Sequence, residues 1–552
     1  MTDTAWNTVS GTTTGAAFKL FLGCPEQSDL AAAVDTLVAD RVASRIASQD
    51  PTLWGPAAEE EAGKRLAWVD LPERSRSLVD EIALLQVEHR ERGLSRVALC
   101  GMGGSSLAPE VICSSAGVEL DVVDSTDPDY VRRAVEKHLA ETVVVVSSKS
   151  GGTVETDSQR RAFEKAFTDA GIDPAERIIV VTDPGSPLEE QARAAGYRVF
   201  LADPAVGGRY SALTAFGLVP SGLAGADIAG LLDAAEALRP ALESDDADNP
   251  GLQLGALLGV ANAADVDKLV IADAASAYPG FGDWVEQLVA ESTGKEGKGI
   301  LPVVVESTGA TNFKRTTRDA LLASVGSEFV LEGVTSKSGF GVHVDAPLGA
   351  QMLLWEYATA IAGRMIGINP FDQPDVESAK AAAREMLEGG AASPTPVFVD
   401  GPVTVYASGD WLPEGTSSVP EAVEVLLEQL DDRQGYLAVQ AYLDRDRDAE
   451  FAEVREDLAW RIRRPVTFGW GPRFLHSTGQ YHKGGPATGV FLQVTTQPVA
   501  DLAVPDRPFT FHEFLTAQAV GDAAVLADHG RPVLRLHVNG PADLASIRQA
   551  FA

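Results

Sequence analysis

Residues 142–156, TVVVVSSKSGGTVET, hold the pattern that decides the fold: a β-branched run followed at once by a loop of glycines and hydroxyls. Four valines in a row are typical of a strand buried on both faces of a parallel sheet. The loop then offers Ser148, Lys149, Ser150 and Thr153, with two glycines between them. Closely approaching backbone N–H groups and a helix start suit a bound phosphate. A polar helix cap without a ligand is the alternative.

Short apolar runs on both sides of this strand alternate with helical stretches. Further strands are predicted at residues 96–100, 120–123, 177–182 and 198–201, and helices at 131–139 and 156–170. Strand and helix alternating in this way predict an α/β fold with a doubly wound parallel sheet. Ligands of such sheets bind beyond the carboxyl ends of the strands, which is where the glycine-rich loop lies.

The chain divides into three regions on this pattern. Residues 1–95 are predicted to be an N-terminal helical region, 96–223 a first sheet domain, and 224–552 a second sheet domain with a C-terminal appendage. In the last region strands are expected at 268–272, 299–305, 328–333, 403–407, 435–442 and 490–495, and a helix at 351–366. Residues 388–396, rich in glycine and proline, mark a loop or a subdomain boundary.

The composition is that of a globular protein with an acidic surface. The 552 residues are 45% hydrophobic and 22% charged, with a formal net charge of -34. Such a surface argues against nucleic acid and anionic membranes as partners. An anionic ligand would therefore need a locally positive pocket.

Cysteines and targeting signals point to an ordinary cytoplasmic protein. The three cysteines, Cys24, Cys100 and Cys113, have the spacing of neither a zinc site nor a disulfide framework, and we expect them to be buried. The N-terminus lacks the basic and apolar regions of a signal peptide, and no uncharged apolar run is long enough to span a membrane. We expect a cytoplasmic location.

Three further stretches carry residues suited to chemistry on a phosphorylated molecule: GMGGSSLAP (101–109), GGRYSALTAFGL (207–218) and AESTGKEGKGI (290–300). The first is not a dinucleotide fingerprint, because Ser106 stands where the third glycine belongs. Arg209 is suited to hold charge developing on an oxygen, or else forms a surface salt bridge. Glu291 is a candidate general base, or else a solvated glutamate at a helix end.

Two later stretches concentrate polar side chains: GINPFDQPDVESAK (367–380) and HSTGQYHKGG (476–485). Lys380 is predicted about two turns into a helix that starts at Pro374, where a solvated surface lysine is the alternative. The second stretch holds His476 and His482. No carboxylate or cysteine completes a metal motif there, so acid–base work is favoured over metal binding, with a loop of no chemical role as the alternative.

Together these six stretches resemble the glucose-6-phosphate isomerases, built from two sugar-isomerase (SIS-type) domains. The chain is similar to the isomerase part of transaldolase–isomerase fusions. The resemblance implies two doubly wound domains, a site between them and at a dimer interface, a homodimer, a hexose phosphate as substrate and no metal or other cofactor. It implies reversible conversion of glucose 6-phosphate to fructose 6-phosphate through a cis-enediolate, in glycolysis and gluconeogenesis.

The resemblance also assigns roles. Ser148, Lys149, Ser150 and Thr153 would bind the phosphate, and Gly104 and Ser105 would lie against the sugar. Glu291 would move the proton between C1 and C2, and Arg209 would stabilise the enediolate. His476 would assist ring opening, and Gln373 and Lys380 would contact sugar oxygens.

The order of these residues departs from that of the shorter bacterial isomerases, in which the histidine stretch closely follows the glutamate stretch. Here the order is Glu291, Lys380, His476, so a different connection of the second domain is expected, or His482 or His343 takes the role. An isomerase that also accepts mannose 6-phosphate and a non-catalytic sugar-phosphate binder are the alternative functions. A dehydrogenase fits the glycine pattern least.

Overall fold

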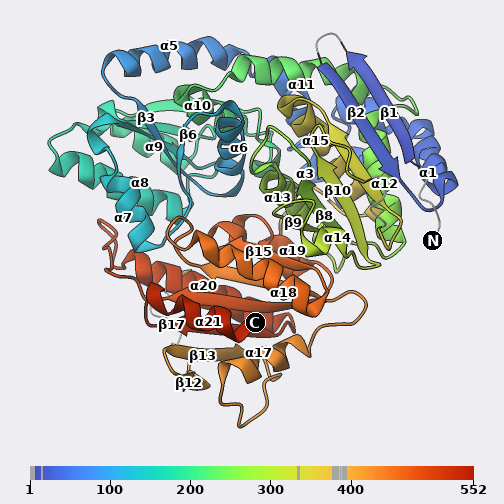
Figure 1. Cartoon of the computed structure of the whole chain (residues 1–552). Coiled ribbons are helices and arrows are strands. Elements are labelled where there is room, and N and C mark those ends of the chain that lie inside the picture. The colour runs from blue at the N-terminus through green and yellow to red at the C-terminus, as the bar shows by residue number, and fades with distance from the viewer. Residues whose placement is uncertain are drawn as a thin grey trace.

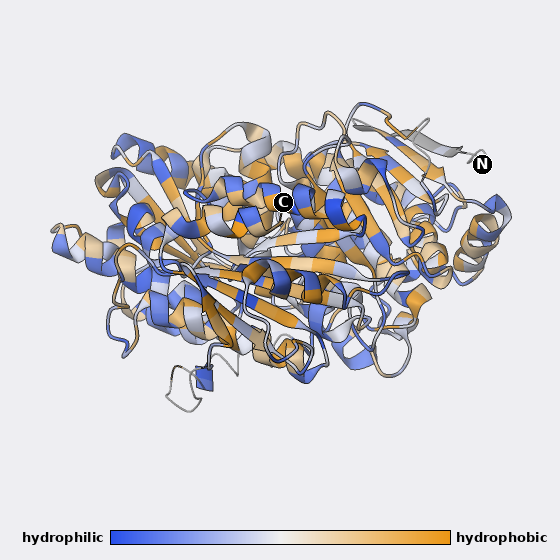
Figure 2. Ribbon diagram, turned by 60° about the horizontal axis from the view of Figure 1, so that its bottom comes forward, coloured by the Kyte–Doolittle hydropathy of each residue, from blue (hydrophilic) through white to orange (hydrophobic). Residues whose placement is uncertain are grey.

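The computed structural model describes residues 6–13, 16–331, 336–375, 384–385, 387 and 394–551. Within these ranges the strands form three separate sheets, each with helices packed on it (Figure 1). Most strands are apolar and lie inside, whereas the outer faces of the helices carry the hydrophilic residues (Figure 2). The α/β class predicted from the alternation is confirmed.

The first sheet is wholly parallel, in the order β4-β3-β5-β6-β7. Its strands are β3 (Arg96–Gly101), β4 (Asp121–Val123), β5 (Thr142–Ser147), β6 (Ile178–Thr182) and β7 (Arg198–Leu201). Its helices are α5 (Ser77–Glu91), α6 (Leu107–Ala116), α7 (Pro128–Glu136), α8 (Val154–Asp169), α9 (Pro187–Ala194) and α10 (Ala215–Ala224). Every residue of β5 is buried, because helices cover both faces. The strands predicted here are confirmed.

The second sheet has the order β1-β2-β11-β10-β8-β9. A parallel core is formed by β8 (Lys268–Asp273), β9 (Leu301–Val305), β10 (Ala320–Val325) and β11 (Gly341–Asp345). An antiparallel hairpin, β1 (Trp6–Thr13) and β2 (Ala16–Gly23), adds to β11. The region predicted to be helical at residues 1–95 therefore also contains this hairpin, and the strand expected at 328–333 lies instead at β10.

Helices pack around the second sheet and fill the space between it and the first. They are α1 (Gln27–Ala39), α2 (Val42–Ala47), α3 (Glu59–Ala62), α4 (Leu71–Arg74), α11 (Ile228–Glu243), α12 (Pro250–Ala263), α13 (Phe281–Thr293), α14 (Thr311–Lys314) and α15 (Leu348–Ile366). The helix predicted at 351–366 is confirmed as α15. It is apolar on nearly every side, because α11, α12 and α13 surround it.

The third sheet has the order β12-β13-β17-β16-β14-β15. Its strands are β12 (Phe398–Asp400), β13 (Val403–Ser408), β14 (Tyr436–Tyr442), β15 (Val466–Trp470), β16 (Gly489–Thr496) and β17 (Val533–Val538). Its helices are α17 (Val419–Leu427), α18 (Val454–Ile462), α19 (Gly479–Gly484), α20 (Phe511–Asp528) and α21 (Leu544–Phe551). The expectation of two sheets with an appendage is wrong here, because these strands bond to one another and enclose an apolar cluster of their own. The domain limits at residues 95 and 223 stay predictions.

The second and third sheets share one topology. In chain order, the parallel strands of each run 2-1-3-4 across the sheet, as β9-β8-β10-β11 and β15-β14-β16-β17. Each sheet continues beyond its fourth strand with an antiparallel hairpin, β2-β1 or β13-β12. No helix within the described ranges is long and apolar enough to cross a bilayer.

Candidate active site

The glycine-rich loop after β5 lies where the strand order of the first sheet reverses. Gly101 at the end of β3 pairs with Ser147 at the end of β5, so the loops that follow these two strands are neighbours. Gly151 has a φ of +68° and packs against α9, where a Cβ would lie 2.8 Å from the backbone nitrogen of Leu188. This geometry requires glycine and sets the loop in front of α8.

Hydroxyls and backbone N–H groups of this loop are placed to hold an anion. Ser148 Oγ donates to Thr153 Oγ1 at 3.1 Å, and the Gly152 N–H donates to Ser150 Oγ at 3.2 Å. Thr153 precedes the sixteen-residue helix α8, whose first N–H groups are free to bind a phosphate. The ammonium of Lys149 pairs with Asp183 at 2.5 Å, and its expected contact with a phosphate stays a prediction.

The three glycine-containing loops touch one another. At Gly104 a Cβ would lie 2.0 Å from the carbonyl oxygen of Gly208, so the turn at Gly103–Ser105 meets the turn at Gly208–Tyr210 backbone to backbone. At Gly103, whose φ is +55°, a Cβ would lie 2.6 Å from the carbonyl oxygen of His476. Ser105 is half-buried beside this junction. Side chains are excluded at both glycines because the loops need this close approach.

Arg209 is buried and reaches across to the segment that carries Gln373. Its Nη1 donates to Gln373 Oε1 at 2.9 Å, and its Nη2 donates to the carbonyl oxygens of Pro370 and Asp372. Its Nε donates to Ser292 Oγ at 2.8 Å, which fixes the plane of the guanidinium. A buried, always charged arginine held in this way is a fixed positive pole.

Glu291 faces that pole from the last turn of α13. Its Oε1 lies 3.5 Å from Arg209 Nη1, and its side chain keeps 13% of its surface exposed. Gln287, one helical turn earlier, donates from Nε2 to Glu291 Oε2 at 3.1 Å and to the carbonyl oxygen of His476 at 2.8 Å. The carboxylate is thus oriented from two sides and still accessible.

His476 approaches the same place from the third sheet. Its Nε2 lies 3.0 Å from Glu155 Oε1, and Gln518 of α20 donates to that oxygen at 2.7 Å. Because Glu155 is in the first turn of α8, this contact joins the glycine-rich loop after β5 to Gln287 and Glu291. The two regions that the proposed chemistry needs therefore belong to one connected site.

The other two candidate histidines are used elsewhere. His482 Nδ1 lies 3.0 Å from the hydroxyl of Tyr436, and burial holds the pKa of His482 well below its usual value. His343 Nδ1 lies 2.9 Å from Ser324 Oγ on the neighbouring strand, and burial lowers the pKa of His343 as well. Of the three, His476 alone contacts residues of the site.

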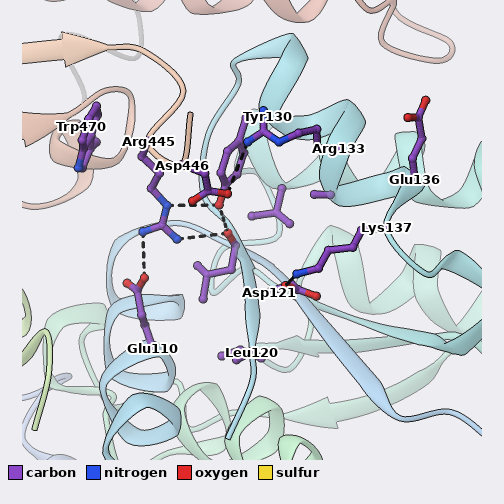
Figure 3. Close-up of a pocket in the computed structure, with 13 residues that line it drawn as sticks. Glu110, Leu120, Asp121, Tyr130, Arg133, Glu136, Lys137, Arg445, Asp446 and Trp470 are labelled. Atoms are coloured by element: carbon purple, nitrogen blue, oxygen red, sulfur yellow. Dashed lines mark hydrogen bonds and ion pairs between the residues drawn. The ribbon is translucent and has the colours of Figure 1, made fainter. Parts of the chain in front are cut away.

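Buried ion pairs fix the turn Arg473–His476. Arg473 lies 2.6 Å from Glu110 Oε2 and 2.7 Å from Asp124 Oδ2, so it ties the turn to the first sheet. Arg445 binds the other oxygen of Glu110 at 2.9 Å and donates to the Tyr130 hydroxyl (Figure 3). Although burial opposes ionisation, the two guanidinium groups lower the pKa of Glu110 to about 2.

The segment that carries Gln373 is clamped at both ends. Lys295 Nζ donates to the carbonyl oxygens of Asn369 and Asp372 at 2.7 and 2.6 Å. Burial, together with the charge of Arg209, lowers the pKa of Lys295 to about 8. Gln480 accepts from the Asp375 N–H at 3.0 Å. Lys380 lies outside the described residues.

Sequence analysis assigned no role in the site to four residues that support it: Gln287, Glu155, Gln480 and Gln518. Lys295 was a candidate only as one of the cations that could make the pocket positive. Gln287 was detectable in principle, because it precedes Glu291 by four residues, which is one turn of a helix that ends near Glu291. Glu155, Lys295 and Gln480 lie inside the quoted stretches, but nothing in those stretches names their partners. No group of three or more histidine, cysteine, aspartate or glutamate side chains suited to a metal occurs in the described part of the chain.

A carboxylate facing a buried arginine, beside an anion-binding loop of a parallel α/β sheet, defines the class: a protein built to act on a small phosphorylated molecule. The family model described as phosphoglucose isomerase matches residues 73–321. A glucose-6-phosphate isomerase from Cyanothece sp. is 31% identical over 357 residues, which cover 54% of this chain and 67% of the relative. The chain belongs to the phosphoglucose isomerase family.

Other comparisons agree in sequence and in fold. A probable glucose-6-phosphate isomerase from Haloarcula marismortui is 29% identical over 55% of this chain and 80% of its own length. A hypothetical protein from Thermus thermophilus superimposes with a TM-score of 0.56 at 24% identity, over 65% of this chain and 97% of its own. A glucose-6-phosphate isomerase from Chlamydia trachomatis gives 0.55 at 19%, over 70% and 91%. The family match ends before Gln373 and His476.

Proposed function

We propose that the chain catalyses the reversible isomerisation of glucose 6-phosphate and fructose 6-phosphate. The observation that carries the proposal is the pairing of the accessible Glu291 carboxylate with the buried Arg209 guanidinium, 3.5 Å apart. Moving a proton between adjacent carbons needs a carboxylate in reach of both, and a fixed cation for the oxygens that gain charge. Membership in the phosphoglucose isomerase family supports the same reaction.

The remaining residues fit the steps of this reaction. The loop with Ser148, Ser150 and Thr153 and the N-terminus of α8 would bind the substrate phosphate, with Gly104 and Ser105 beside the sugar. His476, oriented by Glu155, would transfer the proton that opens the ring. Glu291 would then take the proton from C2, form a cis-enediolate and return the proton to C1.

The contacts support the roles proposed for Gln373, Lys149 and Lys380 to different extents. Gln373 accepts a hydrogen bond from Arg209, the residue proposed to stabilise the enediolate. The sugar oxygens that Gln373 is proposed to contact would therefore lie close to the enediolate. Lys149 has Asp183 as a close partner, and we propose that it adds positive potential to the loop without direct phosphate contact. The contact proposed for Lys380 with sugar oxygens rests on the resemblance.

We further propose a homodimer, a cytoplasmic location and a role in glycolysis and gluconeogenesis, as the resemblance implies. Arg209, Glu291 and His476 meet within one chain, so dimerisation would not be needed to bring these three together. Size-exclusion chromatography with light scattering tests whether the chain is a homodimer. Specific activity measured on dilution tests whether the site works without dimerisation, and activity that falls as dimers dissociate would contradict this independence.

A coupled assay of the purified protein with fructose 6-phosphate tests the proposed reaction, with mannose 6-phosphate as a parallel substrate and a chelator as a parallel condition. Glu291→Gln removes the base but keeps the size of the side chain. We expect turnover to fall by at least about a thousandfold, because general-base catalysis is lost, while thermal unfolding and substrate binding stay close to wild type. Near-normal turnover of this variant would remove Glu291 from its role.

A further inference from the structure

A row of polar side chains crosses the third sheet under α20. Tyr406, Arg535, Gln493 and Gln440 stand side by side on β13, β17, β16 and β14. Residues paired in register point to the same face of a sheet, whereas the flanking Leu534 and Leu536 face the apolar core on the other side. A guanidinium in the middle of a sheet is costly unless it is paired.

Arg535 is buried yet has no ionic partner. Its residue is 7% exposed, and its guanidinium lies 4.2 Å from the centre of the Tyr406 ring. Among the described residues it makes no hydrogen bond and no ion pair. Burial lowers the pKa of its guanidinium, and the charges that oppose this shift are those of tyrosines.

The other buried arginines show what a satisfied guanidinium looks like in this chain. Arg455 binds Glu306 and Asn312, and Arg160 binds Asp157 and Glu164. Arg531 donates to two backbone carbonyl oxygens, and Arg209 is held as described above. Arg535 is the exception in this set: its guanidinium has no hydrogen-bond or ionic partner among the described residues, and its nitrogens keep contact with solvent.

Arg535 lines a cavity of about 410 Å³ between α20 and the β13–β17 strands. This is within the size range of small-molecule sites. The Tyr406 and Ser408 side chains and Thr395 add hydroxyls, and Val520 of α20 adds an apolar wall. Two exposed carboxylates, Asp528 and Glu385, also line it.

We propose that this cavity binds a small anionic metabolite, through a carboxylate or phosphate group held by Arg535. A guanidinium stacked on an aromatic ring keeps its N–H edge free, and that edge forms the paired hydrogen bonds that suit either group. The two exposed carboxylates disfavour polyanions, so the ligand carries one anionic group with hydroxyl or ammonium groups beyond it. The site lies on the third sheet and does not depend on the proposed isomerase reaction.

Calorimetric titrations of the full chain with inorganic phosphate and with glycolate, a monocarboxylate that carries a hydroxyl group, test the proposal and separate the two anion types. The variants are Arg535→Gln, Arg535→Lys and, as a surface control of equal charge change, Arg548→Gln. We expect Arg535→Gln to weaken binding of at least one probe at least tenfold and Arg535→Lys to weaken it less. Arg548→Gln should bind as wild type. Equal affinity and stoichiometry in wild type and Arg535→Gln for both probes would overturn the proposal.

Phosphate bound near Ser148 must be distinguished from phosphate bound at Arg535. Ser148→Ala should affect one class of phosphate sites and Arg535→Gln the other, so the double variant should lose both. Turnover of Arg535→Gln with fructose 6-phosphate in buffer without these anions should stay within about twofold of wild type. Binding is measured directly, so a failure of the isomerase proposal leaves this test intact.

Folding of the variants has its own control. Arg535→Met replaces an unpaired buried cation by an apolar chain of similar length, so its thermal unfolding midpoint should match or exceed that of wild type. Crystals of the wild-type chain soaked in selenate should show anomalous density beside Arg535. Selenate found elsewhere but not beside Arg535 would overturn the proposal even if every variant unfolds.

Discussion

The second and third sheets have the same strand order but present their site residues in different ways. The second sheet supplies Glu291 from α13, a helix of 13 residues in which Gln287 supports it one turn earlier. The third supplies His476 from a turn of four residues, held by ion pairs to Glu110 and Asp124 of the first sheet. A regular helix positions a side chain locally, whereas a short turn depends on partners far away in the chain.

The largest effect on stability is expected for a fully buried ion pair of the third sheet. Lys483 and Asp522, both fully buried, lie 2.5 Å apart and join α19 to α20. Asp522→Ala leaves the ammonium without its partner, and breaking such a pair costs about 3–5 kcal/mol of unfolding free energy. Denaturant unfolding measures the loss. The double variant Lys483→Met, Asp522→Leu should recover much of it, and equal losses in both would contradict the pairing.

The next effect concerns the placement of His476. Arg473→Met removes the contacts to Glu110 and Asp124, and a shift of about 1 Å in a catalytic group lowers turnover about 100-fold. We expect kcat to fall more than KM rises, because the phosphate loop stays in place. Arg473→Lys keeps the charge and should lose less. Unchanged kcat in folded Arg473→Met would show that the turn needs no such anchor.

A smaller effect is expected in the second sheet. Gln287→Leu removes one hydrogen bond to Glu291 and one to the backbone of His476, while α13 itself persists. We predict a loss of about tenfold in kcat/KM, since one hydrogen bond to a charged group contributes about 1.5–3 kcal/mol and the helix limits the displacement. Steady-state kinetics check this. A loss larger than that of Arg473→Met would reverse the comparison.

The effect that is smallest at neutral pH is a pH dependence of stability, because it develops only above pH 8. Lys295 has a pKa of about 8 in the folded chain, against 10.5 as its ordinary value. Between these values the unfolded chain binds more protons, so the contribution of Lys295 to stability rises with pH and is lost as pH falls through 8. Lys295→Met should remove a slope of at most about 1.4 kcal/mol per pH unit. Parallel stability curves of wild type and variant from pH 7 to 10 would contradict this.

The sequence predicted those parts of the molecule that local patterns determine. The valine run of β5 identified the first sheet, because a buried parallel strand has few compatible sequences, whereas anion binding by the loop after it stays a prediction. The grouping of Arg209, Glu291 and His476 came from the resemblance and agrees with the contacts. The contact of Arg473 with Asp124 spans 349 residues, and no local pattern encodes such a pairing.

Sequence analysis did not predict the third sheet or the hairpin of β1 and β2, and both omissions have the same physical cause. The third sheet repeats the alternation of the second, so periodicity alone gave no reason to separate them. The hairpin of β1 and β2 is rich in threonine, serine and glycine, and its partner β11 lies more than 300 residues away. Strand pairing across such distances depends on the folded surroundings and is invisible to short windows of sequence.

The hairpin at residues 6–23 also protects the edge of a sheet. β2 satisfies backbone N–H and C=O groups of β11, which would otherwise be open to a strand of another molecule. Shortening the chain by these residues would leave the isomerase residues in place but uncover that edge. Removal of these residues is therefore expected to cause self-association of the protein and not loss of catalytic activity.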